Sequence, residues 1–277
     1  MLASPVRFAV IGDYGESSRP EIDVARQIRG WKPNFIITVG DNNYPSGAAS
    51  SVDRNIGRAY HQFIYPYAGA YGSGPDDGLN HFFPALGNHD WQTRGARPYL
   101  QYFHLPGNER YYTFTQGPVQ FFVLDSDPHE PDLGFVKASR STANSIEGQW
   151  LKSQLAKSQA QWKIVYFHHP PYSSGTIHGS SAWMQWPFKK WGANAILSGH
   201  EHNYERIIRD GLPYFVDGLG GNTEIYDTFR RPVAGSKIRY AGDFGAMRID
   251  ATDTSISFRF VARSGKVIDR YTMKTPT

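Results

Sequence analysis

Six residues with metal-binding side chains each follow a short apolar segment of this 277-residue chain. They are Asp13, Asp41, Asn88, His168, His200 and His202. Carboxylate, amide and imidazole ligands suit iron, zinc and manganese. A single residue of this kind is commonly a helix cap or a satisfied polar group, but the repeated placement favours a metal site. His200 and His202 lie two apart, so in extended backbone both would point to one face and could reach a shared metal cluster.

The apolar segments that precede these residues have the length of buried strands. They are Val6–Ile11, Phe35–Val39, Phe82–Leu86, Lys163–Phe167 and Ala195–Leu197. Helices are predicted over Pro20–Trp31 and Ile146–Ser158. Alternation of strands and helices indicates parallel sheets, which bind ligands outside the carboxyl ends of their strands. The candidate ligands are therefore expected at one sheet edge.

The remaining strand signals are antiparallel in character. Tyr111–Thr115 and Val119–Leu124 form a predicted hairpin. The C-terminal third adds strands at Tyr214–Val216, Ala246–Ile249, Ser255–Val261 and Val267–Tyr271. By itself this pattern predicts a mixed α/β protein with a mixed or double sheet.

Composition narrows the possible classes. Hydrophobic residues make up 40% of the chain, which is enough for a sizeable core, and no apolar run approaches the roughly 18 residues of a membrane span. The absence of cysteine excludes thiolate nucleophiles, cysteine-ligated metals and disulfides. The net charge of +4 favours anionic substrates, but no block of like charges predicts nucleic-acid binding. Oligomeric state and cell compartment stay open.

Five motifs, taken in order, resemble those of the calcineurin-like metallophosphoesterases and, more narrowly, of the purple acid phosphatases. They are Gly12-Asp13-Tyr14-Gly15, Gly40-Asp41-Asn42-Asn43-Tyr44, Gly87-Asn88-His89-Asp90, Val165-Tyr166-Phe167-His168 and Gly199-His200-Glu201-His202. Phosphodiesterases and nucleases of the superfamily usually carry Asp-x-His in the first motif, whereas Asp13 is followed by Tyr14 and Gly15. Tyr44 matches the tyrosinate that binds ferric iron in the purple acid phosphatases.

The resemblance implies a four-layer α/β/β/α sandwich with two mixed β-sheets, formed by residues 1–277 as a single catalytic domain. It implies two metal pockets. Fe(III) would be held by Asp13, Asp41, Tyr44 and His202. A divalent metal (Fe, Zn or Mn) would be held by the bridging Asp41 with Asn88, His168 and His200. The implied activity is hydrolysis of small phosphomonoesters at acidic to neutral pH, by attack of a metal-bound hydroxide.

Further residues in or near the motifs are expected to support this chemistry. His89 and His178 match outer-sphere histidines of the family and are the candidate acid–base or substrate-binding groups. Asp90 and Glu201 are expected to orient imidazole or backbone groups. His169 either supports the site or points to the opposite face.

Two other functions remain open from the sequence. One is a metal-dependent phosphodiesterase or nuclease of the same superfamily. The other is an inactive domain that only recognises phosphorylated ligands.

Overall fold

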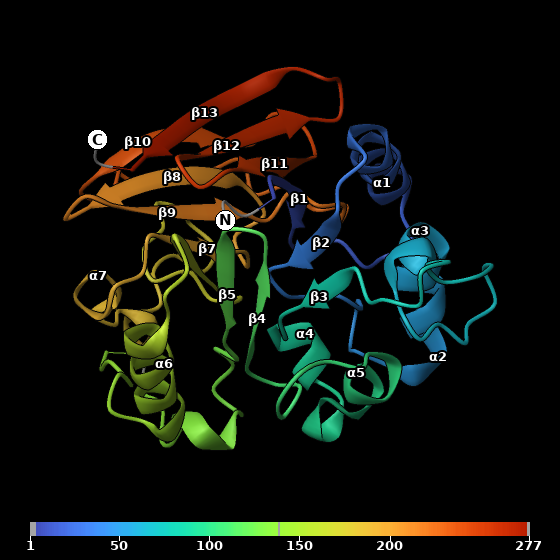
Figure 1. The fold of residues 1–277 in the computed structure, drawn as a ribbon, viewed down its shortest axis with the longest axis horizontal. Helices are drawn as coiled ribbons and strands as arrows, with labels where there is room; N and C mark the ends of the chain where they lie inside the picture. The colour runs from blue at the N-terminus through green and yellow to red at the C-terminus, as the bar shows by residue number, and fades with distance from the viewer. Residues whose placement is uncertain (1–3, 138, 276–277) are drawn as a thin grey trace.

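The computed structural model describes residues 4–137 and 139–275, and its elements alternate as predicted (Figure 1). The chain begins with β1 (Val6–Ile11), α1 (Arg19–Trp31) and β2 (Phe35–Thr38). The Ser18 side chain caps α1 by accepting a hydrogen bond from the Glu21 N–H, and Pro20 lies in the first turn, where no N–H partner is needed. The predicted first helix is therefore confirmed, with one more residue at its start.

The first sheet combines N-terminal and C-terminal strands. Its order is β13-β12-β11-β1-β2-β3, with β3 (Phe82–Pro84), β11 (Gly245–Ala251), β12 (Ser255–Ala262) and β13 (Val267–Lys274). β1, β2 and β3 are parallel, whereas β11 pairs antiparallel with β1. The last three strands therefore close the same sheet that carries the first three motifs.

The second sheet has the order β10-β8-β9-β7-β6-β5-β4. Its strands are β4 (Tyr112–Gln116), β5 (Val119–Val123), β6 (Trp162–Tyr166), β7 (Ala195–Ser198), β8 (Tyr204–Arg209), β9 (Leu212–Asp217) and β10 (Ser236–Tyr240). The predicted hairpin is confirmed as the antiparallel pair of β4 and β5, and β5, β6, β7 and β9 are parallel. Both sheets are thus mixed.

β8 and β10 have no counterpart in the predicted elements. β8 carries charged residues on both faces. The strand tolerates them because each charged side chain interacts with a buried or half-buried partner. Glu205 accepts hydrogen bonds from the side chains of Ser174 and Ser236, and Arg206 forms an ion pair of 2.6 Å with Asp269. These partners are remote in sequence, so periodicity could not reveal them.

Helices cover the outer faces of the two sheets (Figure 1). Those beside the first sheet are α1, α2 (Ala49–Val52), α3 (Arg58–Tyr60), α4 (Asn88–Trp91) and α5 (Arg97–Tyr102), and those beside the second are α6 (Ile146–Lys157) and α7 (Phe188–Trp191). Between the sheets lies an aromatic core, in which Phe8 packs edge-on against Phe121 at 5.0 Å. This is the expected α/β/β/α sandwich.

Within the described residues, no helix combines the length and the apolar composition of a membrane span.

Candidate metal centre

The candidate ligands lie at the carboxyl ends of five strands, as the motif positions require. Asp13 and Asp41 follow β1 and β2, and both adopt a left-handed backbone conformation with φ of 54°. Aspartate tolerates this conformation better than most residues. Gly40 precedes Asp41 with φ of 96°, and a Cβ there would lie 2.5 Å from Nδ1 of His168. Close approach of this turn to His168 therefore requires glycine.

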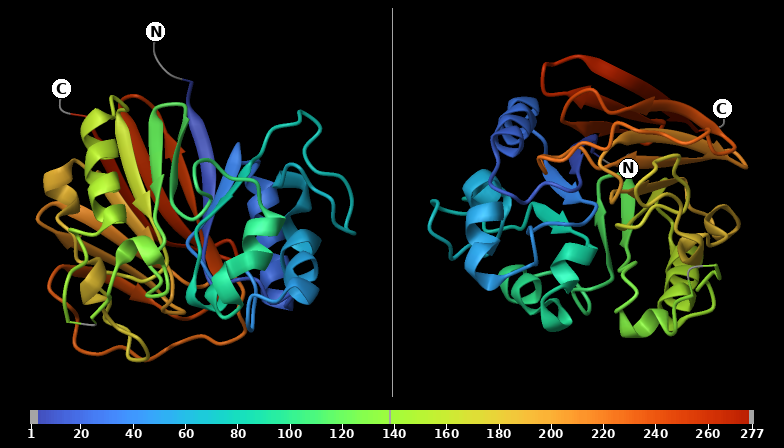
Figure 2. Two further views of the ribbon diagram at one scale, coloured as in Figure 1. Left: turned by 90° about the horizontal axis from the view of Figure 1, so that it is seen from below. Right: turned by 180° about the vertical axis from the view of Figure 1, so that it is seen from behind.

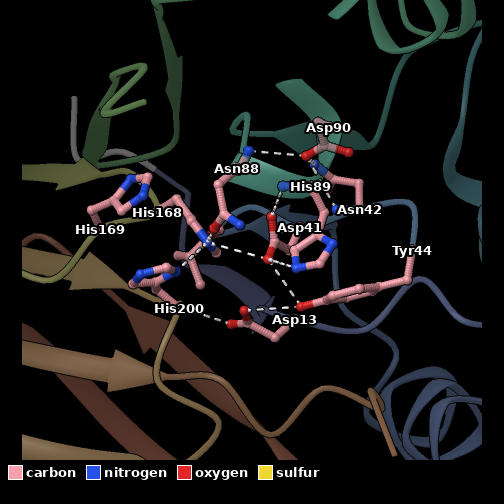
Figure 3. A network of polar contacts seen from close by, with 12 residues as sticks. Asp13, Asp41, Asn42, Tyr44, Asn88, His89, Asp90, His168, His169 and His200 are labelled. Atoms are coloured by element: carbon pink, nitrogen blue, oxygen red, sulfur yellow. Dashed lines mark hydrogen bonds and ion pairs between the residues drawn. The ribbon is translucent and has the colours of Figure 1, made fainter. Parts of the chain in front are cut away.

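Asp13, Asp41 and Tyr44 converge at one end of the site (Figure 3), and His202 joins them there. The Tyr44 hydroxyl lies 3.3 Å from Asp13 Oδ1, 3.0 Å from Asp41 Oδ2 and 3.3 Å from His202 Nε2. His202 Nε2 lies 3.5 Å from Asp13 Oδ1. Its other ring nitrogen, Nδ1, contacts the Glu224 carbonyl at 2.8 Å, which fixes the ring orientation. These four residues are the group expected to hold Fe(III).

A second group converges on the same oxygen of Asp41. His168 Nε2 lies 3.3 Å from Asp41 Oδ2, 2.9 Å from Asn88 Oδ1 and 3.1 Å from His200 Nδ1. His168 Nδ1 contacts the Val39 carbonyl at 2.9 Å. The structure therefore brings all seven candidate ligands into two adjacent groups that share Asp41.

The donor set fits a bound cation. Ligand atoms of Asp13, Asp41 and His168 lie within 4.8 Å of one another, and all three residues are buried. Among the described residues, no lysine or arginine forms an ion pair with either aspartate, whose only such partners are histidines. Buried carboxylates without a fixed cationic side chain require another positive charge.

The pKa values of the ligand side chains also indicate that the site requires a bound cation. Burial opposes the ionised form of Asp41, but the neighbouring His168 and His89 outweigh it and hold the pKa of Asp41 well below its usual range. Burial disfavours protonated His168, yet the Asp41 carboxylate raises its pKa to about 10. Burial, with Asp41 and Asp13, raises the pKa of Tyr44. A phenolate at this position therefore depends on a nearby cation.

The two candidate acid–base histidines contact different ligands. The backbone N–H of His89 donates to Asp41 Oδ1 at 2.8 Å, and the ring nitrogen Nε2 of His89 lies 3.9 Å from Asp41 Oδ2. The His89 side chain is 29% exposed. The His178 ring stacks on His200 with centroids 4.0 Å apart. Both histidines are close to the ligands without belonging to either group.

Two buried carboxylates hold the loops of the site in place. Asp90 Oδ2 accepts hydrogen bonds from Asn42 Nδ2 at 2.8 Å and from the Gly87 N–H at 2.9 Å, which joins the second and third motifs. Burial, reinforced by Asp41, raises the pKa of Asp90 to about 7. Glu201 Oε1 accepts the backbone N–H groups of His178 and Gly179. The expected orienting roles of both residues therefore act on backbone and amide groups.

His169 and Tyr226 also contact the ligands. The buried His169 ring lies 4.4 Å from the His200 ring and contacts Ser126 Oγ through Nδ1 at 2.9 Å, so it does not face away from the site. Tyr226 stacks on His202 with centroids 4.2 Å apart. No motif surrounds Tyr226, and no sequence signal could have identified it.

One expectation about the histidine pair is wrong. His200 has φ of 70°, so the backbone between His200 and His202 is not extended. The two rings diverge, with His200 joining the His168 group and His202 joining the Tyr44 group. The turn thus assigns one histidine to each group.

The fold and the site define the class of protein. Residues 6–204 match the model of the calcineurin-like phosphoesterase family, and the chain belongs to that family. The phosphatase-type hydrolase that the five motifs predict agrees with this family.

Within the family, the sequence relatives are acid phosphatases. Purple acid phosphatase 15 of Arabidopsis thaliana is 28% identical over 260 residues, which cover 79% of this chain and 46% of that protein. This chain thus spans about half the length of that relative. Tartrate-resistant acid phosphatase type 5 of Rattus norvegicus is 23% identical, with 95% of this chain and 89% of that protein covered. The resemblance to purple acid phosphatases is therefore confirmed.

Solved structures share the fold. Purple acid phosphatase PPD1 from yellow lupin (Lupinus luteus) superposes with a TM-score of 0.77 at 18% identity, covering 98% of this chain and 54% of that one. GAP50, described as the anchor in the inner membrane complex of Plasmodium, superposes with a TM-score of 0.74 at 23% identity, covering 99% and 90%. Proteins of different roles thus share this fold, so function has to be argued from the site.

Proposed function

We propose that this chain is a binuclear metal-dependent acid phosphatase that hydrolyses small phosphomonoesters. The observation that carries the proposal is the position of Asp41 Oδ2, which lies 3.0 Å from the Tyr44 hydroxyl and 3.3 Å from His168 Nε2. One carboxylate oxygen is thus shared by two groups of candidate metal ligands, one with the Tyr44 phenol and one rich in imidazole. The core between the two sheets supports a single catalytic domain.

The residues divide between the two metals as the resemblance implies. Asp13, Tyr44 and His202 would hold Fe(III), Asn88, His168 and His200 would hold a divalent ion of iron, zinc or manganese, and Asp41 would bridge them. The phenolate and two carboxylates suit the harder trivalent ion, and the imidazole-rich group suits the divalent one. When bound, the metals supply Lewis-acid charge and make a coordinated water acidic enough to act as hydroxide near neutral pH.

The protein's own groups orient the substrate and manage its proton. His89 Nε2 lies 3.9 Å from Asp41 Oδ2 and the side chain is partly exposed, so the ring could contact a phosphate or leaving-group oxygen. There it would donate a hydrogen bond, or the proton that the leaving alkoxide needs. His178 stacks on the ligand His200, and this contact restricts its ring.

Burial, the largest influence, lowers the pKa of His178. We therefore propose that neutral His178 forms a hydrogen bond with the phosphoryl group, and that His89 is the acid.

Turnover of 4-nitrophenyl phosphate and bis(4-nitrophenyl) phosphate tests the function directly. The metal-loaded protein is expected to favour the monoester in kcat/KM at acidic to neutral pH, and Asp41→Asn is expected to abolish that turnover. Preference for the diester would identify a phosphodiesterase instead. Metal binding without turnover of either ester would identify a phosphate-recognising domain.

A further inference from the structure

A basic surface flanks the loop that carries His178. It consists of Arg230, Arg231, Lys237 and Arg239, which we call the basic strip. All four residues are exposed. In the described part of the chain none of them forms an ion pair, although the acidic residues Glu224 and Asp227 lie in the same connection. The strip therefore presents uncompensated positive charge beside the candidate site.

The connection between β9 and β10, which includes Arg230 and Arg231, runs against the 173–181 loop (Figure 2, left, orange beside yellow along the lower edge). Phe229 forms a β-bridge with Gly175, and the Arg230 N–H donates to the Ser174 carbonyl at 2.8 Å. The side chains of Thr176 and Thr228 contact each other as well. Arg230 is thereby joined to the loop that presents His178.

Two buried glutamates hold this pair of segments. Glu205 accepts hydrogen bonds from the backbone and hydroxyl of Ser174 at 2.7 and 2.6 Å, and from the Ser236 hydroxyl at 2.6 Å. Glu201 holds His178 through its N–H at 2.8 Å. The backbone around the strip is thus fixed relative to the ligand His200, which His178 stacks upon.

The Arg230 guanidinium is restrained but keeps free donors. Its Nη2 donates to the Thr176 carbonyl at 3.0 Å. Its Nη1 lies close to Gly179, because a Cβ atom at that glycine would be 3.5 Å from Nη1. Gly179 is the residue after His178, so the guanidinium lies beside the loop that presents His178. A guanidinium has five N–H donors, and the remaining ones can bind a phosphate in bidentate geometry.

Arg239 is oriented by the same segment. Its Nη1 donates to the Arg230 carbonyl at 3.1 Å, and its guanidinium lies 5.2 Å from the centre of the Phe229 ring. Lys237 and Arg239 line one hollow with Phe229. Arg239 therefore joins Lys237 to Arg230.

We propose that the basic strip, with Arg230 at its inner end, is a subsite for a second phosphate group of the substrate. The preferred substrates would then be phosphomonoesters that carry another phosphate several bonds from the scissile one. This inference rests on the proposed phosphatase function, because it assumes that the scissile phosphate binds at the metal ligands.

A matched pair of substrates tests the subsite. Fructose 1,6-bisphosphate and fructose 6-phosphate differ by one phosphate, and initial phosphate release from metal-loaded protein gives kcat/KM for each. We expect the bisphosphate to be favoured by more than the factor of about two that a second scissile group provides. The preference should shrink as salt rises from 0.05 to 0.5 M, because exposed charge pairs are screened.

Arg230→Gln should lower kcat/KM for the bisphosphate about 3- to 10-fold more than for the monophosphate, mainly through KM, which is the range for one charged contact. Arg270→Gln, an exposed arginine on β13, is the matched control and should alter neither preference nor KM. An unchanged preference in Arg230→Gln, or no preference in the wild type, overturns the subsite while leaving the phosphatase intact. Failure to hydrolyse both fructose phosphates and 4-nitrophenyl phosphate would overturn the phosphatase proposal itself.

Discussion

Asp41 Oδ2 lies 3.0 Å from the Tyr44 hydroxyl, and the same oxygen lies 3.3 Å from His168 Nε2. Tyr44 lies three residues after Asp41, whereas His168 comes from a different sheet. Because one carboxylate oxygen serves both groups, a change at Asp41 affects more of the site than a change at any other ligand.

Asp41→Asn is expected to lower the occupancy of both metals, since the amide is neutral and a weaker bridging ligand. His200→Ala, which removes a residue from the His168 group alone, should leave the Tyr44 group occupied. Metal analysis of both purified variants, with circular dichroism as a control for folding, measures this difference. Loss of the same single metal from both variants would contradict the shared position of Asp41.

Tyr44→Phe tests the identity of the first metal. A phenolate bound to ferric iron gives a charge-transfer absorption band in the visible, so iron-containing wild-type protein should be coloured. The variant should lose this band, because phenylalanine offers no oxygen to the metal. An iron-free, colourless wild type with full activity would rule out the ferric assignment, although a binuclear hydrolase would remain possible.

His89→Ala separates metal binding from proton transfer. The variant should retain both metals and lower kcat by about 10²- to 10⁴-fold, the usual contribution of a positioned acid–base group. Alkyl phosphates should lose more activity than 4-nitrophenyl phosphate, because nitrophenolate leaves without protonation. Equal losses for the two esters would assign His89 to phosphate binding alone.

Glu201 provides a test of loop positioning. Glu201→Ala removes the acceptor of the His178 and Gly179 N–H groups, and unpaired buried donors of this kind cost about 1–3 kcal/mol each. KM for phosphate esters should therefore rise as His178 loses its position. Glu201→Gln keeps an acceptor oxygen and should preserve most of the wild-type KM. If glutamine and alanine raise KM alike, the carboxylate charge matters more than the hydrogen bonds.

Asp217 predicts a specific dependence of stability on pH. Burial, the largest influence, raises the pKa of its carboxyl group well above the usual value, Asp13 raises it further, and a backbone contact with Met247 offsets them only in part. The folded state then keeps a proton that the unfolded state releases above about pH 4. Asp217 therefore lowers the free energy of unfolding as pH rises, by up to about 1.4 kcal/mol per pH unit.

Asp217→Asn should remove this dependence, so the variant gains stability relative to the wild type between pH 4.5 and 7.5. Urea unfolding at both pH values measures the gain. Asp76→Asn, at an exposed aspartate, is the control and should show no such trend. An equal stability difference at both pH values would refute the prediction.

The sequence determined the chemistry of the site because that information is local. Each motif places a ligand directly after an apolar strand, and parallel strands bring such positions to one edge of their own sheet. The seven candidate ligands and the helix over Pro20–Trp31 could therefore be predicted. The β4–β5 hairpin could also be predicted, because its two strands are adjacent in the sequence.

Tertiary structure decided how these ligands are divided between two groups. His200 and His202 separate because His200 adopts a left-handed conformation, which follows from packing of the turn and not from residue spacing. Tyr226 reaches His202 through a long connection, and β8 is stabilised through Glu205 and Arg206 by partners far along the chain. Such contacts depend on which segments the two sheets bring together, and no periodicity within a short window records them.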